Sequence, residues 1–329
     1  MNPREILKST GPHPALLTLR RLWLGLLLLS ALIVAVTHFG DIERFLGQMQ
    51  RAEPAWLAVA LLIQVATYFS VAELWRRALR RGGARIPLMA LVPLGLAKQF
   101  SDQALPIGGM SGTAFLVAAL ARRGVPAQLC MAALLVSLIA YYSAYLLFAI
   151  ASVLLLWLHH AMQGWIVATA LVFGLLAVAM PAGALWLQSF GARPLPPLVL
   201  RIPGLKAMLG SFSETSAELV RDRGLLVAAL LLHGAVFLLD ALTLWVMLYA
   251  VGQPTSFGVV LPAFIMASVV ATLAPVPLGL GTFEASCVAM LAALGVPIEA
   301  GLTATLLLRG FTLWLPMLPG LWLTRRALR

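Results

Sequence analysis

The sequence predicts an all-α integral membrane protein with six spanning helices and two re-entrant helical hairpins arranged as an inverted repeat. Hydrophobic residues make up 61% of the 329 residues and charged residues 11%, and the mean hydropathy is +0.96. This is too little polar material to cover a water-soluble globule of this size. The apolar runs extend over about 20 residues without alternating, which favours spanning helices over barrel strands. A stretch rich in Pro and Gly also recurs in both halves of the chain.

Six uninterrupted apolar stretches are long enough to cross a bilayer. They are 22–39, 55–75, 126–158, 164–188, 224–250 and 298–323. The first follows four basic residues, as the apolar run of a secretory signal does. Because no clear small-x-small cleavage site comes after it, we interpret it as a spanning helix.

Two further apolar stretches, 87–121 and 258–294, are each interrupted by Pro and Gly. The interruptions leave arms of about 12 to 17 residues, which is shorter than the roughly 20 residues that a crossing needs. We therefore expect each stretch to be a re-entrant hairpin that enters and leaves the membrane by one face.

The distribution of positive charge predicts the orientation, because Lys and Arg accumulate in cytoplasmic loops. Of the 23 basic residues, 19 lie in intervals that the layout places on one side, which are 1–21, 76–86, 122–125, 189–223 and 324–329. The loops on the other side contain only Arg44 and Arg51. Both termini are therefore predicted to be cytoplasmic. The net charge of +11 is explained by topology and anionic lipid headgroups, and no nucleic-acid partner is expected.

The cytoplasmic interval 189–223 contains an amphipathic segment. Leu205, Met208, Leu209 and Phe212 follow the i, i+3, i+4, i+7 spacing of one helix face, which predicts a helix along the membrane interface. We treat 1–329 as a single transmembrane domain, in which this interval connects two half-repeats.

The half-repeats extend over about 87–158 and 258–323. Shifting the sequence by 171 positions aligns Pro106–Pro126 with Pro277–Pro297 without a gap, and 12 of the 31 positions that begin at Pro106 are identical. The charge distribution places the two hairpins on opposite faces, so the repeat is inverted. Inverted repeats with broken helices are typical of transporters, in which the broken helices meet near the midplane and bind the substrate.

Five charged residues lie inside apolar segments, where each costs roughly 2.5 to 3.5 kcal/mol unless it is paired or faces a wet cavity. They are Lys98, Asp102, Asp240, Glu284 and Arg309. Lys98 and Asp102 are four residues apart and can neutralise each other. Arg309 has no acidic neighbour within a turn, so its partner is Glu284, Asp240 or a substrate phosphate. The five charges sum to minus one, which favours no headgroup charge over another.

The hairpin turns supply further polar groups. The short helices that follow Gly109 and Gly281 begin with unpaired N–H groups and a positive dipole end, which suits a phosphate. Polar side chains of the first turn can bind a headgroup, or they can simply be exposed. The candidate substrate-binding residues are Lys98, Gln99, Ser101, Asp102, Gly108, Gly109, Ser111, Asp240, Pro277, Gly279, Gly281, Thr282, Glu284 and Arg309.

We predict no cofactor and no metal. The glycines of the turns are not followed by the Lys-Ser/Thr of a nucleotide-binding loop. The five histidines have no metal-ligand spacing. Cys130 and Cys287 lie in apolar stretches and are interpreted as small buried hydrophobic residues.

On these motifs the chain resembles the family of lysylphosphatidylglycerol-synthase transmembrane regions, the flippase-like membrane proteins. The resemblance covers nearly the whole chain and rests on LPIGGMSG with ARRGVP, on PVPLGLGTFE with GVP, and on LLLRGF, which contains Arg309. The first half departs from the pattern, since an Arg often found after the first hairpin is replaced by the neutral stretch around Ser137 and Leu138.

The resemblance implies a multi-pass protein of the bacterial inner membrane that transfers a lipid between leaflets and is not an enzyme. The lipid would be an aminoacylated phosphatidylglycerol, another phospholipid, a polyprenyl-linked sugar or a hopanoid, and the partners would be this lipid and the bilayer. Two alternatives stay open. A membrane-embedded enzyme of lipid-linked sugar metabolism would need paired carboxylates in a long loop, and a small-solute or ion transporter would need a cavity closed to lipid.

Overall fold

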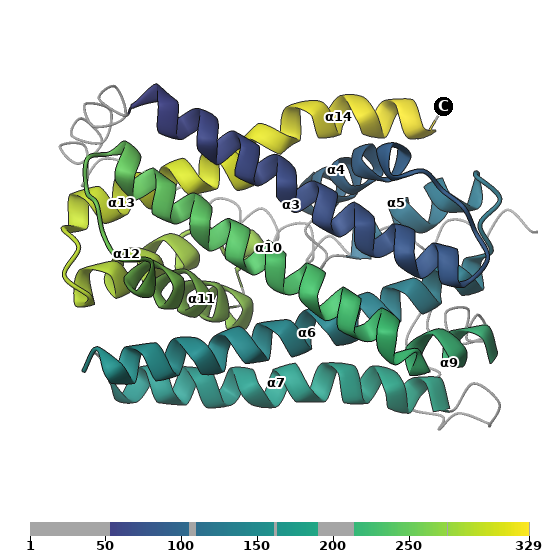
Figure 1. Cartoon of the computed structure of the whole chain (residues 1–329), viewed down its shortest axis with the longest axis horizontal. Helices are drawn as coiled ribbons and strands as arrows, with labels where there is room; N and C mark the ends of the chain where they lie inside the picture. The colour runs from purple at the N-terminus through teal and green to yellow at the C-terminus, as the bar shows by residue number, and fades with distance from the viewer. Residues whose placement is uncertain (1–52, 105–109, 161–162, 190–213, 275, 329) are drawn as a thin grey trace, which may run out of the picture. The chain divides into compact units, whose positions relative to one another are not determined.

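Every element of the described structure is a helix (Figure 1). The computed structural model describes residues 53–104, 110–160, 163–189, 214–274 and 276–328, which belong to one compact unit. The elements are α3 (Pro54–Arg81), α4 (Leu88–Ala104), α5 (Met110–Ala121), α6 (Ala127–Leu158), α7 (Gly164–Ser189), α9 (Glu214–Arg221), α10 (Arg223–Ala250), α11 (Phe257–Leu273), the 3₁₀ turn η3 (Pro277–Gly279), α12 (Thr282–Ala293), α13 (Ile298–Arg309), the π-helical η4 (Gly310–Trp314) and α14 (Leu315–Leu328). The all-helical prediction is confirmed for this part of the chain.

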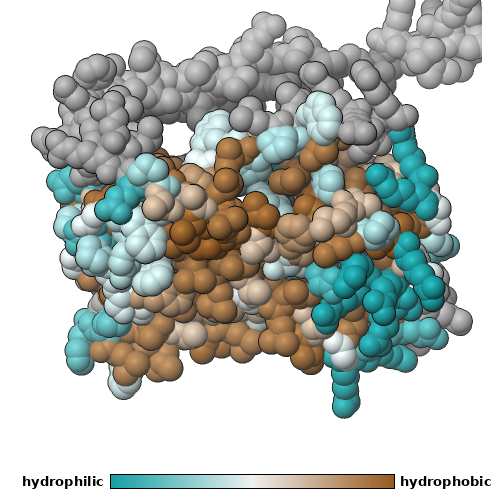
Figure 2. All heavy atoms as spheres, turned by 45° about the horizontal axis from the view of Figure 1, so that its top comes forward, coloured by the Kyte–Doolittle hydropathy of each residue, from teal (hydrophilic) through white to brown (hydrophobic). Residues whose placement is uncertain are grey.

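Five helices are long and apolar enough to cross a membrane. They are Pro54–Arg81, Ala127–Leu158, Gly164–Gly183, Arg223–Ala250 and Ile298–Met317. Each coincides with a predicted span, and the remaining predicted span, 22–39, lies outside the described residues. Large apolar side chains on these helices are exposed, such as Leu171 at 69% and Leu175 at 74%. Figure 2 shows a broad hydrophobic surface with hydrophilic residues gathered toward its two sides. Such a surface is stable against lipid, so the chain is a multi-pass membrane protein.

Helices α3 and α10 lie side by side in opposite directions and define two ends of the described unit (Figure 1). At one end the Glu53 amide donates to the Ala250 carbonyl at 3.1 Å. At the other end Arg81 pairs with Asp222, whose carboxylate caps α10 by accepting from the Leu225 amide at 3.0 Å. We refer to these as the 53–250 end and the 81–222 end.

The short helices α4 and α11 begin at opposite ends of the described unit. Gly82 packs directly against Leu129 near the start of α6, so α4, which follows Gly82 after a short turn, begins at the 81–222 end. A Cβ on Gly258, at the start of α11, would lie 3.8 Å from Nε2 of His159 at the other end of α6. Helix α11 therefore begins at the 53–250 end.

The two interrupted stretches form two pairs of short helices that pack against each other within each pair. The first helix pair consists of α4 with 17 residues and α5 with 12. The second consists of α11 with 17 residues and α12 with 12. These lengths agree with the predicted arms, and each is shorter than the roughly 20 residues that a perpendicular crossing requires. Each predicted half-repeat thus contains one such pair.

Each helix pair has its own apolar core, and α10 contributes to both. The first core includes Leu94, Leu120 and Cys130, and the second includes Ile265, Met290 and Cys287. Both thiols are fully buried, as expected for small apolar residues. The last helical segment also joins the two pairs, because it contacts α12 through α13 and α4 through α14.

Only the end of the predicted connector, 189–223, is described. It forms α9, which packs on α6, with Leu219 only 5% exposed in the first core. The amphipathic residues Leu205, Met208, Leu209 and Phe212 lie outside the described residues.

Candidate functional site

The last predicted span is interrupted by a π-helical segment directly after Arg309. Helix α13 ends at Arg309, the segment Gly310–Trp314 has π-helical hydrogen bonding, and α14 continues from Leu315. A π-segment widens one turn and turns its backbone groups away from their usual partners, and such segments are frequent at functional sites. This segment places Arg309 beside the second helix pair and Thr312 beside the first.

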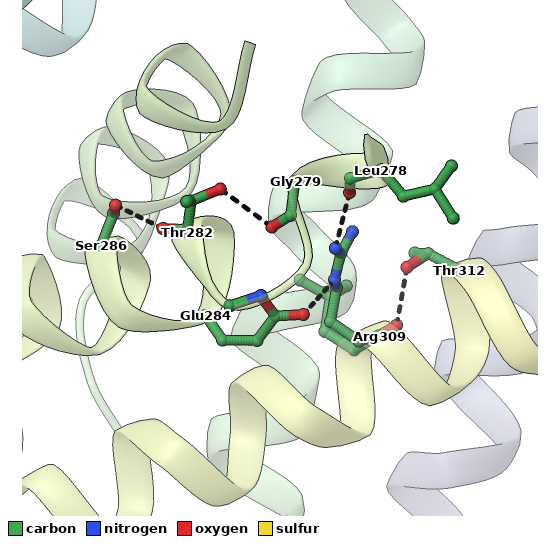
Figure 3. A network of polar contacts seen from close by, with 9 residues as sticks. Leu278, Gly279, Thr282, Glu284, Ser286, Arg309 and Thr312 are labelled. Atoms are coloured by element: carbon green, nitrogen blue, oxygen red, sulfur yellow. Dashed lines mark hydrogen bonds and ion pairs between the residues drawn. The ribbon is translucent and has the colours of Figure 1, made fainter. Parts of the chain in front are cut away.

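The turn of the second helix pair has an unusual backbone. Leu278, Gly279 and Gly281 have φ values of 60°, 62° and 80°, in the region that only glycine adopts readily. A Cβ on Gly279 would lie 2.7 Å from the Cβ of Ala271, so glycine is also needed there for space. The bend directs the Leu278 carbonyl toward the last helix, where it accepts a hydrogen bond from Nη2 of Arg309 at 2.9 Å (Figure 3).

Glu284 and Arg309 form the central ion pair. Nε of Arg309 lies 2.6 Å from Oε1 of Glu284, and the two side chains are only 12% and 15% exposed. The other carboxylate oxygen, Oε2, accepts from the Gly281 amide at 2.7 Å. The guanidinium also lies over the Phe283 ring, with Cζ at 4.9 Å from the centroid. The carboxylate therefore joins a cation to the start of a short helix (Figure 3).

The partner of Arg309 is thus Glu284, one of the three choices that the sequence left open. Thr282 is the first residue of α12, but its side chain does not bind an amide of the helix start. Its hydroxyl donates to the Gly279 carbonyl at 3.0 Å, and the carboxylate of Glu284 occupies the helix start, because it adds charge to the hydrogen bond at the positive dipole end. Pro277 and Gly279 form the η3 turn that leads into this site.

The first helix pair contains a second carboxylate that joins a cation to a helix start. Lys98 and Asp102 form the predicted pair, with Nζ at 2.8 Å from Oδ2. Oδ1 of Asp102 accepts from the Gly112 amide in the first turn of α5 at 2.7 Å. Ser111 donates to the Ser101 carbonyl at 2.9 Å. The pair is more open than the second, with side chains 29% and 19% exposed.

The two helix pairs are linked through the last segment. Nε2 of Gln99, on α4, donates to the Thr312 carbonyl in the π-helical segment at 2.9 Å. The close approach of α4 and α14 is allowed by Gly320, where a Cβ would lie 2.5 Å from the Cβ of Phe100. Among the remaining predicted residues, the Ser101 hydroxyl donates to the Ala97 carbonyl at 2.9 Å, while Gly108 and Gly109 lie outside the described residues.

Asp240 lies apart from both ion pairs. Its Oδ1 accepts from Nε2 of Gln64 at 3.0 Å, and the same amide donates to the Thr243 hydroxyl at 2.9 Å. Within the described part of the chain Asp240 has no salt bridge. The sequence therefore placed five charges in the membrane, and the fold assembles four of them into two ion pairs.

Sequence reasoning missed several contributors to these contacts, among them the Gln64 amide, the Phe283 ring and the carbonyls of Leu278 and Thr312. Gln64 carried a usable signal, because an amide inside the apolar stretch 55–75 needs a polar partner. The two carbonyls carried none, since any residue supplies the same group. The described residues contain no group of three or more His, Cys, Asp or Glu side chains that could hold a metal. Substrate binding by the predicted site residues stays a prediction.

Comparison with known families gives one match that covers most of the chain. The model of the lysylphosphatidylglycerol synthase TM region matches residues 22–320. No curated protein matches the sequence.

Proposed function

Because the chain belongs to the lysylphosphatidylglycerol synthase TM region family, we propose that it moves a lipid between the two leaflets of the membrane and performs no chemical step on it. The substrate is a lipid whose headgroup carries a phosphate, and the bilayer is the second partner. The observation that carries the proposal is the Arg309–Glu284 ion pair at the turn of the second helix pair. Thr312, three positions after Arg309, makes the contact with Gln99 of the first helix pair.

The two helix pairs support an inverted arrangement. Helix α4 begins at the 81–222 end and α11 at the 53–250 end, and each of the four helices in the two pairs is too short to cross the bilayer. In transporters with inverted repeats, broken helices of this kind enter from opposite faces and alternately expose a site near the midplane. We therefore propose that both pairs are re-entrant hairpins, and that the last segment transmits movement between them.

The ion pair supports recognition of a phosphate. A carboxylate now occupies both the Gly281 amide and the Arg309 guanidinium, and a phosphate oxygen can make the same two contacts with more negative charge. In the proposed cycle the lipid phosphate replaces Glu284 at Arg309 and at the helix start. After release, the carboxylate returns and keeps the empty site from holding an unpaired buried cation, which would cost several kcal/mol.

The orientation is part of the same proposal. The basic intervals 76–86 and 122–125 belong to the 81–222 end, which we assign to the cytoplasmic face of a bacterial inner membrane with both termini on that side. Variants Arg85→Cys and Pro254→Cys test it in intact cells with a membrane-impermeant maleimide. Labelling at position 254 but not at 85 is expected, because the reagent does not cross the membrane and reaches only the outer side. The two native thiols are buried and should not add to the labelling. The reverse pattern would invert the assignment.

The translocation test measures leaflet exposure of a fluorescent phospholipid in vesicles that contain the full chain. We expect Arg309→Gln to slow exchange at least about tenfold, since one charge-assisted contact contributes about 1.5 to 3 kcal/mol. Glu284→Gln, which keeps a hydrogen-bond acceptor beside the helix start, is expected to retain phosphate binding but release lipid more slowly. Arg85→Gln removes the same charge from an exposed loop and serves as the control. Equal exchange by all four proteins would remove the proposed site.

A further inference from the structure

A second positively charged site lies at the 81–222 end. A cavity of about 340 Å³ opens between the last turns of α3 and the first turns of α10. Its lining consists of Glu73, Arg76, Arg77, Arg80, Arg81, Gly224, Leu225 and Ala228. None of these residues belongs to the Arg309 site, and four arginines in one cavity are a recognition surface for phosphate groups.

Two of the arginines are held in place by one acid. Glu73 accepts from Nε and Nη2 of Arg76 at 2.6 and 2.9 Å and from Nε of Arg77 at 2.8 Å. The Glu73 side chain is 16% exposed, while those of Arg76 and Arg77 are 36% and 52% exposed. A bidentate contact orients the guanidinium and leaves its other N–H groups available for a ligand. Glu73 therefore preorganises two donors at the cavity.

The remaining two arginines leave an excess of positive charge. Arg81 pairs with Asp222, whereas Arg80 is exposed and has no side-chain hydrogen bond or ion pair with another residue that the structure describes. Four arginines against Glu73 and Asp222 give a net charge of plus two. A charge excess of this size beside an unpaired guanidinium matches an anionic phosphate.

The opposite wall of the cavity is apolar. Leu225 and Ala228 of α10 line it, and the adjacent surface of α10 continues with Val227 and Leu231, which are 57% and 64% exposed. Val227 and Leu231 are four residues apart, so they lie on one helix face one turn from each other. A ligand that fills the cavity thus meets charge at one side and an exposed apolar helix face, suited to acyl chains, at the other.

We propose that this cavity binds the phosphate headgroup of an anionic phospholipid from the leaflet at the 81–222 end, with its acyl chains along Val227 and Leu231 of α10. Arg80 is the main contact, and Arg76 and Arg77 are supporting donors. This lipid is a bound partner of the fold rather than the transported molecule. The site therefore stands whether or not the Arg309 site translocates lipid.

Native mass spectrometry of the full chain in detergent tests the site by titration with phosphatidylglycerol, phosphatidylcholine or inorganic phosphate. Wild type is expected to bind phosphatidylglycerol about thirtyfold more tightly than phosphatidylcholine, because two additional positive charges face the ligand at about 1 kcal/mol each. Arg80→Gln should weaken phosphatidylglycerol binding about fivefold by the same scale. It leaves no acid without a partner, so its far-UV circular dichroism should match wild type.

Arg85→Gln provides the matched control, since it removes one charge from the same end but outside the cavity. Its binding should change by less than about twofold, because Arg85 does not line the cavity and solvent screens its charge from a ligand bound there. Repeating the titrations in an Arg309→Gln background separates this site from the transport site, and the fivefold effect of Arg80→Gln should persist there. Equal losses in Arg80→Gln and Arg85→Gln, disappearance of the effect in the Arg309→Gln background, or displacement of the lipid by an equal concentration of inorganic phosphate would each overturn the proposal.

Discussion

The two helix pairs use the same device with different partners. In each pair a carboxylate binds a cation with one oxygen and, with the other, a backbone amide at the start of the pair's second helix. Asp102 reaches this amide from the preceding helix, whereas Glu284 lies on the helix whose start it binds. In the first pair the cation is Lys98, one turn from Asp102 on the same helix. In the second the cation is Arg309, which reaches Glu284 from another helix.

The difference determines what each contact can couple. The Lys98–Asp102 pair joins only α4 to α5, whereas the Arg309–Glu284 pair joins the second helix pair to the last segment, which also makes the contact between Thr312 and Gln99. The positions are not equivalent in the repeat, since the shift of 171 residues pairs Leu138 with Arg309 and Thr113 with Glu284. The comparison therefore assigns the connecting role to the second pair.

The largest expected effect is that of Arg309→Gln. Removing one partner of a poorly exposed ion pair leaves the other charge without compensation, so the free energy of unfolding should fall by about 3 kcal/mol or more. Arg309→Lys keeps the charge but not the two directed contacts to Glu284 and Leu278, and it should lose less. Unfolding in mixed detergent micelles, followed by circular dichroism, measures both. A loss below about 1 kcal/mol for Arg309→Gln would make the two pairs alike.

Gly279→Ala should have the next largest effect. The alanine must adopt a left-handed backbone conformation, which costs roughly 1 to 2 kcal/mol. Its Cβ must also displace Ala271. We expect a total loss of about 2 to 3 kcal/mol in the same unfolding experiment. Gly281→Ala has similar backbone strain, but a Cβ there has open space, so it should lose only about 1 kcal/mol. Similar losses for both variants would show that the contact with Ala271 is unimportant.

Gly112→Ala tests the corresponding contact of the first pair. A Cβ at this position would collide with the Lys98 carbonyl and with the Asp102 side chain that binds the Gly112 amide. The collision outweighs the gain in helix propensity, which is at most about 1 kcal/mol, and a net loss of about 1 to 2 kcal/mol is expected. Gly95→Ala, in α4 with nothing within 4 Å of the new Cβ, should instead stabilise the protein by about 0.5 to 1 kcal/mol. A gain in both variants would contradict the tight α4–α5 packing.

The sequence predicted the features that depend on local composition. The five described spans follow from apolar length, and the 17- and 12-residue arms follow from interruptions by Pro and Gly. The Lys98–Asp102 contact follows from a separation of four residues on one helix. Each of these signals is contained within a single stretch of chain, so no knowledge of tertiary packing is needed.

The rest depends on packing between distant segments. Arg309 had three possible partners by sequence, and only the position of α13 beside the η3 turn selects Glu284. The π-helical segment has no characteristic sequence, and the carbonyls of Leu278 and Thr312 are chemically the same as any others. Gln64 was the exception, because a polar side chain in an apolar span had to have a partner, although its sequence position did not identify Asp240.

Lys98→Gln should have the smallest effect, and it tests the comparison from the side of the first pair. The pair is local and about a quarter exposed, so solvent screens much of its attraction, and the loss in unfolding free energy should stay below about 1 kcal/mol. Asp102→Ala should cost more, about 1 to 3 kcal/mol, because it also leaves the Gly112 amide without its acceptor. If Lys98→Gln instead equals Arg309→Gln, the charge at Lys98 must be coupled beyond its own helix, and the connecting role would belong to both pairs.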